Sequence, residues 1–300
     1  MKNPKQLYIL PFDHRATFSK GLFGFQEPLT KTQHKKVKEA KRMIWQAFVK
    51  VWSKSIHKEA LGILVDEEFG SEIQKAAATL DAVRILTTEK SGQNVFDFEY
   101  GAKFGQHILK FKPDYAKVLV RYNPAEKEIN KKQLKNLKKI NDFCAQKKID
   151  FLFELLVPAT DSQLKNYKNK EKYDLKLRPI LTRKAIYEIR KARIEPDIWK
   201  LEPMSSKSDW QKVINVVKTQ NKKDAKIIVL GRAGSKALVS VWLKIASGFE
   251  DIIGFAVGRT IFFSPLQKYL KKELSKRETI NLIAKNFEYF IGLWEKNRVK

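Results

Sequence analysis

Two lysines of this sequence lie inside short apolar runs. Lys200 stands in the middle of DIWKLEP, and Lys117 stands in YAKVLVRY. If both runs are β-strands, alternate side chains share a face, so Lys117 lies on the same side as Leu119 and Arg121. Desolvation and a neighbouring positive charge both lower the pKa of a lysine and increase the fraction of neutral amine. A neutral amine can attack a carbonyl and form a Schiff base, so the pattern predicts covalent chemistry.

Carboxylates that could move protons accompany these lysines. Glu154 lies within FLFELLVP, and Asp13 closes LYILPFD. Cleavage of a carbon–carbon bond through a Schiff base requires a group that takes up a proton and returns it, and a carboxylate can do this. The alternative interpretation is that each lysine only neutralises a buried carboxylate. For Arg121 and Glu202, an ion-pair network at the end of the strands is the favoured interpretation.

Two glycine–arginine pairs follow the last two apolar runs of the chain. Gly231 and Arg232 come after KIIVL, and Gly258 and Arg259 come after IIGFAV. Backbone N–H groups in a glycine turn, the start of a helix and a guanidinium together suit a phosphate. The alternative is a pair of turn glycines followed by solvent-exposed arginines.

Eight apolar runs of one design recur along the 300 residues and end in charged residues, glycine or proline. They are LYILPFDHR, LGILVDEEFG, AVRILTTEKSG, YAKVLVRYNP, DFLFELLVP, DIWKLEP, KIIVLGRAG and IIGFAVGRT. Each is typical of a strand that is buried on both faces. Helical periodicity between the runs predicts an α/β fold, a closed (β/α)8 TIM barrel, as one domain over residues 1–300. A doubly wound open sheet is the alternative. In such barrels the catalytic groups gather at the carboxyl ends of the strands, where Glu89 also lies.

Helices are expected where apolar residues recur every three or four positions. The expected ranges are 34–57, 71–80, 98–111, 127–148, 183–192, 210–220, 236–247 and 278–294. Thr182, Asp209 and Ser235 are expected to cap three of them at the N-terminus, and Gly248 marks one C-terminal end. The polar stretch 161–176 is either a mobile flap over the barrel mouth or a surface insertion, of which the second is the commoner case.

Composition limits the classes of partner. The formal net charge is +27, but the lysines are spread along the chain, and the densest cluster, 127–148, keeps an apolar stripe typical of an amphipathic helix. We therefore expect a solvated surface rather than a nucleic-acid partner. No apolar run is long enough for a membrane span, and the N-terminus lacks a signal-peptide pattern. With Cys144 as the only cysteine, a cytoplasmic location is expected.

Metal and nucleotide chemistry are not indicated by any motif. The histidines are dispersed without ligand spacing, at positions 14, 34, 57 and 107. We expect no cofactor. His14 follows Asp13 and could contact a substrate.

The carboxyl ends of the runs resemble those of a known enzyme family. The motifs that carry this resemblance are FDHR, VRYNP, the YD…LRP…LT run, PDIWKLE and GFAVGRT. They are similar to the class I, lysine-dependent barrel aldolases of the tagatose-bisphosphate aldolase type. The closer resemblance is to the 2-deoxy-5-keto-gluconate-6-phosphate aldolase-like domain of inositol catabolism. The resemblance extends from about Leu7 to about Pro265.

This resemblance implies an aldehyde-lyase that releases dihydroxyacetone phosphate and an aldehyde. It implies that Lys200 forms the Schiff base, that Lys117 assists proton movement, that Glu154 is the acid–base group and that Asp13 contacts the substrate. It also implies that Arg259 and the Gly258 backbone bind the phosphate, together with Gly231 and Arg232. Arg121 and Glu89 are expected to contact the substrate.

Several alternatives stay open. A tagatose or fructose bisphosphate or a sulfosugar phosphate is the alternative substrate. A barrel that binds a phosphosugar or polyanion without catalysis is the alternative from another class. A homo-oligomer is compatible with the sequence.

Overall fold

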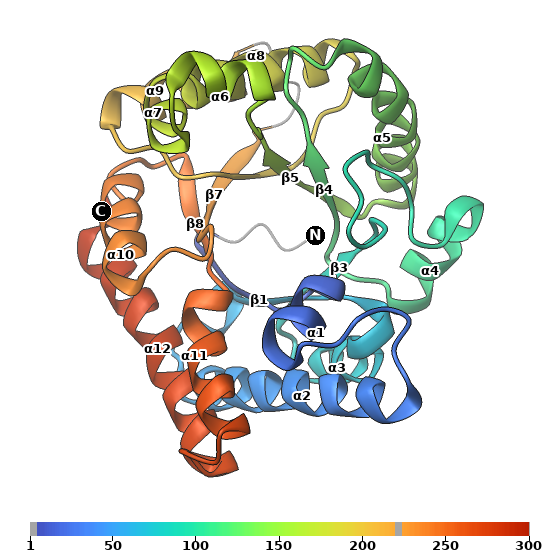
Figure 1. Ribbon diagram of the computed structural model, residues 1–300, viewed down its shortest axis with the longest axis vertical. Coiled ribbons are helices and arrows are strands. Elements are labelled where there is room, and N and C mark those ends of the chain that lie inside the picture. The colour runs from blue at the N-terminus through green and yellow to red at the C-terminus, as the bar shows by residue number, and fades with distance from the viewer. Residues whose placement is uncertain (1–4, 220–223, 300) are drawn as a thin grey trace.

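Eight parallel strands close into a barrel in the computed structural model, which describes residues 5–219 and 224–299. The strands are β1 (Leu7–Pro11), β2 (Leu61–Val65), β3 (Val83–Thr87), β4 (Tyr115–Arg121), β5 (Asp150–Leu156), β6 (Ile198–Leu201), β7 (Lys226–Leu230) and β8 (Ile252–Ala256). They pair in chain order, and β8 returns to pair with β1 (Figure 1). This closure confirms the predicted (β/α)8 barrel and excludes the open sheet.

Helices connect the strands and surround the barrel (Figure 1). They are α1 (Ala16–Phe23), α2 (Lys31–Lys54), α3 (Glu67–Thr79), α4 (Phe104–Phe111), α5 (Lys127–Lys147), α6 (Asp161–Tyr167), α7 (Lys170–Lys176), α8 (Arg178–Lys191), α9 (Lys207–Lys218), α10 (Lys236–Ala246), α11 (Arg259–Leu270) and α12 (Lys276–Asn297). Two short 3-10 turns, η1 (Lys58–Ala60) and η2 (Gly101–Lys103), complete the set within the described residues. The last helix, α12, packs beside α2 and α11, so the end of the chain covers its beginning.

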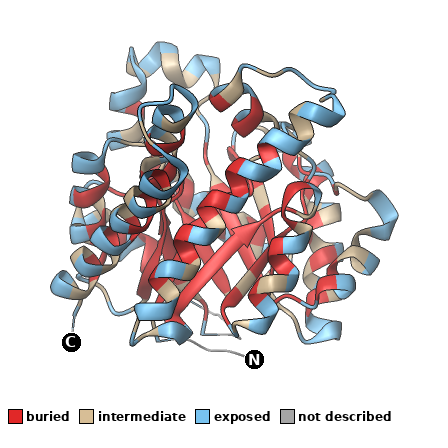
Figure 2. Ribbon diagram, turned by 90° about the horizontal axis from the view of Figure 1, so that it is seen from below, coloured by how far each residue is buried: buried red, intermediate tan, exposed pale blue. Residues whose placement is uncertain are grey.

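Burial separates the barrel wall from the outer faces of the helices. Figure 2 shows buried strands inside a shell of helices whose outer surfaces are exposed. On α5, for example, Leu137 and Ile140 are fully buried while Lys131 and Lys139 are exposed. The amphipathic pattern predicted for 127–148 is therefore confirmed, and its lysines lie on the outer surface.

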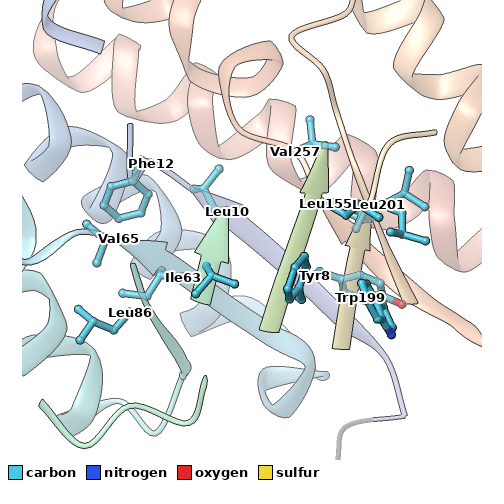
Figure 3. Packing of buried hydrophobic residues seen from close by; sticks show 14 of the residues in the cluster. Tyr8, Leu10, Phe12, Ile63, Val65, Leu86, Leu155, Trp199, Leu201 and Val257 are labelled. Atoms are coloured by element: carbon cyan, nitrogen blue, oxygen red, sulfur yellow. The ribbon is translucent and has the colours of Figure 1, made fainter. Parts of the chain in front are cut away.

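Alternation along each strand gives the barrel two apolar layers. Residues such as Tyr8, Leu10, Trp199 and Leu201 pack outward between strands and helices (Figure 3). The residues between them point into the barrel and form a separate lower core of Leu7, Ile9, Leu64, Val83, Ile85, Tyr115, Leu152, Ile198, Ile228, Ile253 and Ala256. Gly254 permits a close approach, because a Cβ there would lie 1.9 Å from the Leu7 carbonyl oxygen.

Several predicted helix ends were wrong. Ser206, not Asp209, caps α9, and Asp209 occupies the third helical position, where its backbone N–H donates to Ser206. Thr182 lies inside α8, which begins earlier because Pro179 fits its first turn. Ser235 does cap α10, and Gly248 follows the Ser247 C-cap. Residue 220, the last of one expected helix, lies outside the described residues.

The polar stretch 161–176 forms two short helices, α6 and α7. Thr160 and Asn169 cap them at their N-termini. The Tyr173 side chain is buried, and its hydroxyl donates to the Val157 carbonyl oxygen over 2.8 Å. This contact fastens α7 to the carboxyl end of β5.

No helix within residues 5–219 and 224–299 is long and apolar enough to cross a membrane.

Candidate active site

A buried cluster of charges occupies the upper end of the barrel interior. The Lys117 ammonium lies 2.8 Å from Asp13 Oδ2, 2.6 Å from Glu89 Oε1 and 2.9 Å from Glu154 Oε2. These carboxylates come from the ends of β1 and β3 and from within β5, so the cluster exists only in the closed barrel. Lys117 keeps 1 % of its surface exposed. A buried ammonium is tolerable here because its three donors can each meet a carboxylate.

Lys200 lies beside this cluster but is held differently. Strand register pairs Glu154 directly with Lys200, so both side chains leave the barrel wall on the same face. The Lys200 Nζ is 2.9 Å from Glu154 Oε2, and no other carboxylate within the described residues forms an ion pair with it. Its amine therefore has a single proton acceptor at hand. The prediction that both lysines face the barrel interior is confirmed.

The surroundings of Lys117 correct one expectation. Burial alone would lower the pKa of Lys117, but the neighbouring carboxylates outweigh it and raise this pKa well above its ordinary value. The sequence pattern suggested a lowered pKa from burial and a second amine. Lys117 is instead a fixed cation, which makes it a poor nucleophile.

The pKa values of the neighbouring carboxylates shift in the opposite direction. Burial would raise the pKa of Asp13, but Lys117 holds it well below its usual range. Burial would likewise raise the pKa of Glu154, but Lys117 and Lys200 outweigh this effect and lower it. Both carboxylates are thus ionised at neutral pH. Asp13 Oδ2 also accepts a hydrogen bond from the Thr87 hydroxyl at 3.0 Å.

A cavity of about 330 Å³ opens above the cluster. Its walls contain every residue that the sequence singled out for the site, namely Asp13, Glu89, Lys117, Arg121, Glu154, Lys200, Gly231, Arg232, Gly258 and Arg259. The volume falls within the range of small-molecule sites. No group of three or more His, Cys, Asp or Glu residues is arranged to hold a metal ion in the part of the chain that the structure describes.

The turn after β8 has the features of an anion site. Gly258 precedes α11, and Arg259 is its first residue. A Cβ at Gly258 would lie 2.3 Å from the Pro11 carbonyl oxygen, so only glycine fits the close approach of β8 to β1. Arg259 makes no ion pair with a carboxylate in the described residues and lines the cavity beside the free N–H groups of the helix start. Its charge is therefore available to a ligand.

Arg232, after β7, differs from Arg259. Its Nε lies 3.1 Å from Glu202 Oε1, and its Nη1 lies 2.9 Å from Asp174 Oδ2 on α7. Arg232 and Ala233 adopt φ values of 46° and 53°. This left-handed conformation costs about 1 kcal/mol or more per non-glycine residue. The network interpretation thus holds for Glu202, and the charge of Arg232 is already compensated.

Arg121 fixes a loop at the opposite side of the mouth. Its Nη1 donates to the Gln93 carbonyl oxygen at 2.8 Å. Residues 88–99 fold back through an antiparallel bridge between Glu89 and Phe98. β4, which carries Arg121, lies across the barrel from β8 and Arg259. Arg121 and Arg259 therefore line the cavity from opposite sides of the barrel.

Sequence reasoning gave no role to two residues of this region, the strand-end residue Arg15 and Asp174. Arg15 donates to the Glu89 carbonyl oxygen and pairs with Glu99 at 2.5 Å, which holds the loop 88–99 against β1. Asp174 reaches the site from the polar stretch 161–176, which was expected to be a mobile flap or a surface insertion. Both residues belong to the quoted motifs FDHR and YD…LRP, and this was the only signal of their place.

An eight-stranded parallel barrel with charged residues at the carboxyl ends of its strands belongs to the class of (β/α)8 TIM barrels. The chain itself belongs to the family described as uncharacterized protein conserved in bacteria (DUF2090), whose model matches residues 1–298. No curated protein matches the chain.

Solved structures share the fold at low sequence identity. A fructose-bisphosphate aldolase from Plasmodium falciparum, solved in complex with TRAP and a small molecule inhibitor, has a TM-score of 0.68 and 12% identity, covering 100% of this chain and 93% of that chain. A fructose-bisphosphate aldolase from Slackia heliotrinireducens has a TM-score of 0.55 and 9% identity, covering 93% and 86%. A protein from Corynebacterium glutamicum has a TM-score of 0.59 and 14% identity, covering 95% and 86%. These likenesses establish the fold.

Proposed function

We propose that this protein is a class I aldolase that cleaves a phosphorylated keto sugar or keto acid through a Schiff base on Lys200. The observation that carries the proposal is that two buried lysines in one cavity contact different numbers of carboxylates. Lys117 is held by three carboxylates, whereas Lys200 contacts one and lines the space where a ketone would enter. The aldolases among the structural neighbours support the same chemistry by analogy of fold alone.

Glu154 is placed to help form the imine. Its Oε2 lies 2.9 Å from the Lys200 Nζ, so it can accept the ammonium proton before the amine attacks the ketone. The same carboxyl can then protonate the carbinolamine hydroxyl, which leaves as water. Lys117, held 2.9 Å from the same oxygen, keeps a positive charge beside the developing intermediate.

The two arginines suit a substrate with an anion at each end. Arg259 and the start of α11 would bind the phosphate of the ketone half. Arg121 lies across the mouth, where it would contact a carboxylate or a second phosphate. A 2-deoxy-5-keto-gluconate 6-phosphate-like substrate has this form and would give dihydroxyacetone phosphate and malonic semialdehyde. Fructose or tagatose bisphosphate and a sulfosugar phosphate fit the same arrangement.

Trapping of the covalent intermediate tests the proposal. The protein is incubated with dihydroxyacetone phosphate and sodium borohydride, and the modified peptide is located by mass spectrometry. We expect one reduced adduct on Lys200 and none in Lys200→Ala. Lys90→Ala is the matched control, because Lys90 is an exposed lysine at the same cavity, and this variant should retain the adduct.

The result also separates the alternatives. An adduct on Lys117, or none with any phosphorylated ketone of a panel, would contradict the proposal. Saturable binding of the ketone without an adduct would favour the non-catalytic phosphosugar-binding barrel. A turnover panel of the candidate substrates then ranks them by kcat/KM.

A further inference from the structure

A histidine in the cavity has a ring nitrogen without a partner. His14 follows Asp13 at the end of β1 and lines the same cavity as Lys200 and Arg259. Its side chain keeps 33% of its surface exposed, while its Nδ1 is buried and forms no hydrogen bond within the described residues. The nearest carboxylate oxygen, Asp13 Oδ1, lies 3.9 Å away, which is too far for a hydrogen bond. Buried polar atoms are nearly always paired, so Nδ1 is an exception, while the exposed third of the side chain is available to a substrate in the cavity.

Charged groups of both signs surround the His14 ring, which burial keeps neutral. They are Asp13 just after β1, Glu154 on β5, Lys200 on β6 and Arg259 on α11. Burial lowers the pKa of His14 to about 4, with Arg259 and Lys200 acting in the same direction and Asp13 and Glu154 opposing them. At neutral pH the imidazole therefore carries one N–H and one free lone pair.

The carboxylates beside Lys200 are less suited to take a substrate proton. Asp13 and Glu154 have lowered pKa values because Lys117 lies against both of them. One oxygen of each, Asp13 Oδ2 and Glu154 Oε2, already accepts contacts from Lys117, Lys200 or Thr87. A general base needs a lone pair that is free to accept the proton. Of the three groups, His14 alone makes no ion pair with a lysine in the described residues.

We propose that His14 is a catalytic acid–base residue that carries the proton during carbon–carbon cleavage at Lys200, an inference that rests on the proposed aldolase function. The imidazole takes the proton of the hydroxyl that lies β to the iminium carbon. The O–H electron pair becomes the new C=O bond, the carbon–carbon bond breaks, and its electron pair neutralises the iminium as an enamine. The imidazolium then returns the proton to the enamine carbon, and water hydrolyses the resulting iminium to release the ketone and the amine.

Phosphate binding would strengthen this base. Arg259 faces His14 and disfavours its protonation. A phosphate bound at Arg259 would compensate that charge, so the imidazole would accept a proton more readily when a phosphorylated substrate is bound. Cleavage would then be coupled to the presence of the phosphate, and an unphosphorylated ketone would react slowly even when it forms the imine.

Hydrogen exchange in the ketone product isolates the His14 step. A class I aldolase that protonates its enamine exchanges a hydrogen on the hydroxymethyl carbon of dihydroxyacetone phosphate with D₂O, which NMR measures. We expect His14→Gln to retain the borohydride-trapped adduct on Lys200 but to lose the exchange by ~10²-fold or more. His57→Gln, at a histidine whose side chain is 45% exposed, is the matched control and should change neither quantity.

A second variant removes any dependence on how well glutamine fits the site. In His14→Ala we expect added imidazole to restore the exchange in a concentration-dependent way, which a structural role of His14 would not produce. The exchange rate per trapped adduct of the unmodified protein should fall as the pH is lowered, and this fall should be absent in His14→Gln.

The outcomes distinguish the two proposals. Trapped adduct and exchange both at the unmodified rate in His14→Gln and His14→Ala would overturn the role of His14 and leave the aldolase intact. Absence of any adduct in the unmodified protein would overturn the aldolase proposal itself, and the role of His14 with it.

Discussion

At the scale of single residues, the number of neighbouring carboxylates distinguishes the two buried lysines. Lys117 and Lys200 have the same side chain, similar burial and the same cavity. Three ion pairs hold a proton on Lys117, whereas Lys200 contacts a single carboxylate, Glu154, to which it could transfer its proton. A nucleophile and a permanent charge can thus be made from one residue type by the carboxylates around it.

Replacement of Lys117 by Met should reverse the pH dependence of stability in the acid range. In the native protein, Asp13 and Glu154 have lowered pKa values, so their contribution is present above about pH 4 and is lost as the pH falls. Without Lys117 the buried carboxylates repel one another, and their pKa values in the folded state rise above those of the unfolded chain. Their contribution is then greatest at low pH and decreases as the pH rises through the raised values.

Urea unfolding between about pH 3 and 8 measures this difference, because the native protein loses the contribution only below about pH 4. Removal of one partner from a buried ionic cluster costs about 3–5 kcal/mol, so Lys117→Met should be strongly destabilised at pH 8 and less so at pH 5. Lys90→Met, at an exposed lysine, provides the control. Parallel pH profiles for the native protein and Lys117→Met would show that the cluster does not hold these charges.

At the scale of elements, the site depends on how closely β8 approaches β1. The Gly258 turn brings the start of α11 to the cavity and presents Arg259 there. The Thr260 hydroxyl donates to the Gly234 carbonyl oxygen at 2.8 Å and so joins this turn to the one after β7. The proposed phosphate site would therefore depend on two neighbouring turns and not on one arginine.

Gly258→Ala should weaken binding of a phosphorylated ketone. The added Cβ meets the Pro11 carbonyl oxygen at 2.3 Å, so the turn must move away from β1 and take Arg259 with it. We expect the KM for the phosphorylated ketone to rise by about tenfold or more, which corresponds to ~1.4 kcal/mol of lost binding. Steady-state kinetics with phosphorylated and unphosphorylated ketones would measure the effect.

Gly292→Ala is the control for this change. Gly292 lies in α12 with no atom within 4 Å of the new Cβ, so alanine there should stabilise the helix by about 0.5–1 kcal/mol and leave the KM unchanged. If Gly258→Ala behaved like Gly292→Ala in both kinetics and thermal unfolding, the close approach would have no role in phosphate binding.

At the scale of the whole molecule, local pattern was enough to predict the barrel. Each strand is a short apolar run, and the alternation within β4 and β6 predicted which residues share a face with Lys117 and with Lys200, whereas the inward direction of these faces depended on the barrel. The carboxyl ends of parallel strands meet in any closed barrel, so Asp13, Glu154 and Arg259 could be assigned to one site.

The contacts within that site could not be predicted, because they depend on the stagger of the strands. The sequence does not show that Glu89, from the end of β3, reaches Lys117, or that Asp174 reaches Arg232 from the polar stretch 161–176. The wrong sign expected for the pKa of Lys117 has the same origin. Burial and the second amine were visible in the sequence, but the carboxylates that outweigh them were brought there by the closure of the barrel.

The net charge of +27 belongs to the whole surface and should act on the approach of the substrate. A positive surface attracts a phosphorylated ketone over the Debye length, which is about 30 Å at 0.01 M salt and about 10 Å at 0.1 M. We expect the rate of adduct trapping with dihydroxyacetone phosphate, relative to uncharged dihydroxyacetone, to fall by ~10-fold or more over this range of salt. Dihydroxyacetone forms the same adduct but carries no charge, so the ratio of the two trapping rates measures only the electrostatic attraction of the phosphorylated ketone.

A variant with glutamate in place of three exposed lysines of α5, namely Lys131, Lys135 and Lys139, shows which charges steer the substrate. These side chains lie on the outer surface and not in the cavity, so the trapped adduct should still form on Lys200. If the distributed surface charge attracts the substrate, the variant should lose part of the advantage of the phosphorylated ketone at low salt and none of it at high salt. A salt dependence identical to that of the native protein would assign the attraction to Arg259 and the other cations of the mouth alone. If the ratio of the two trapping rates did not change with salt in either protein, the surface charge would have no role in substrate capture.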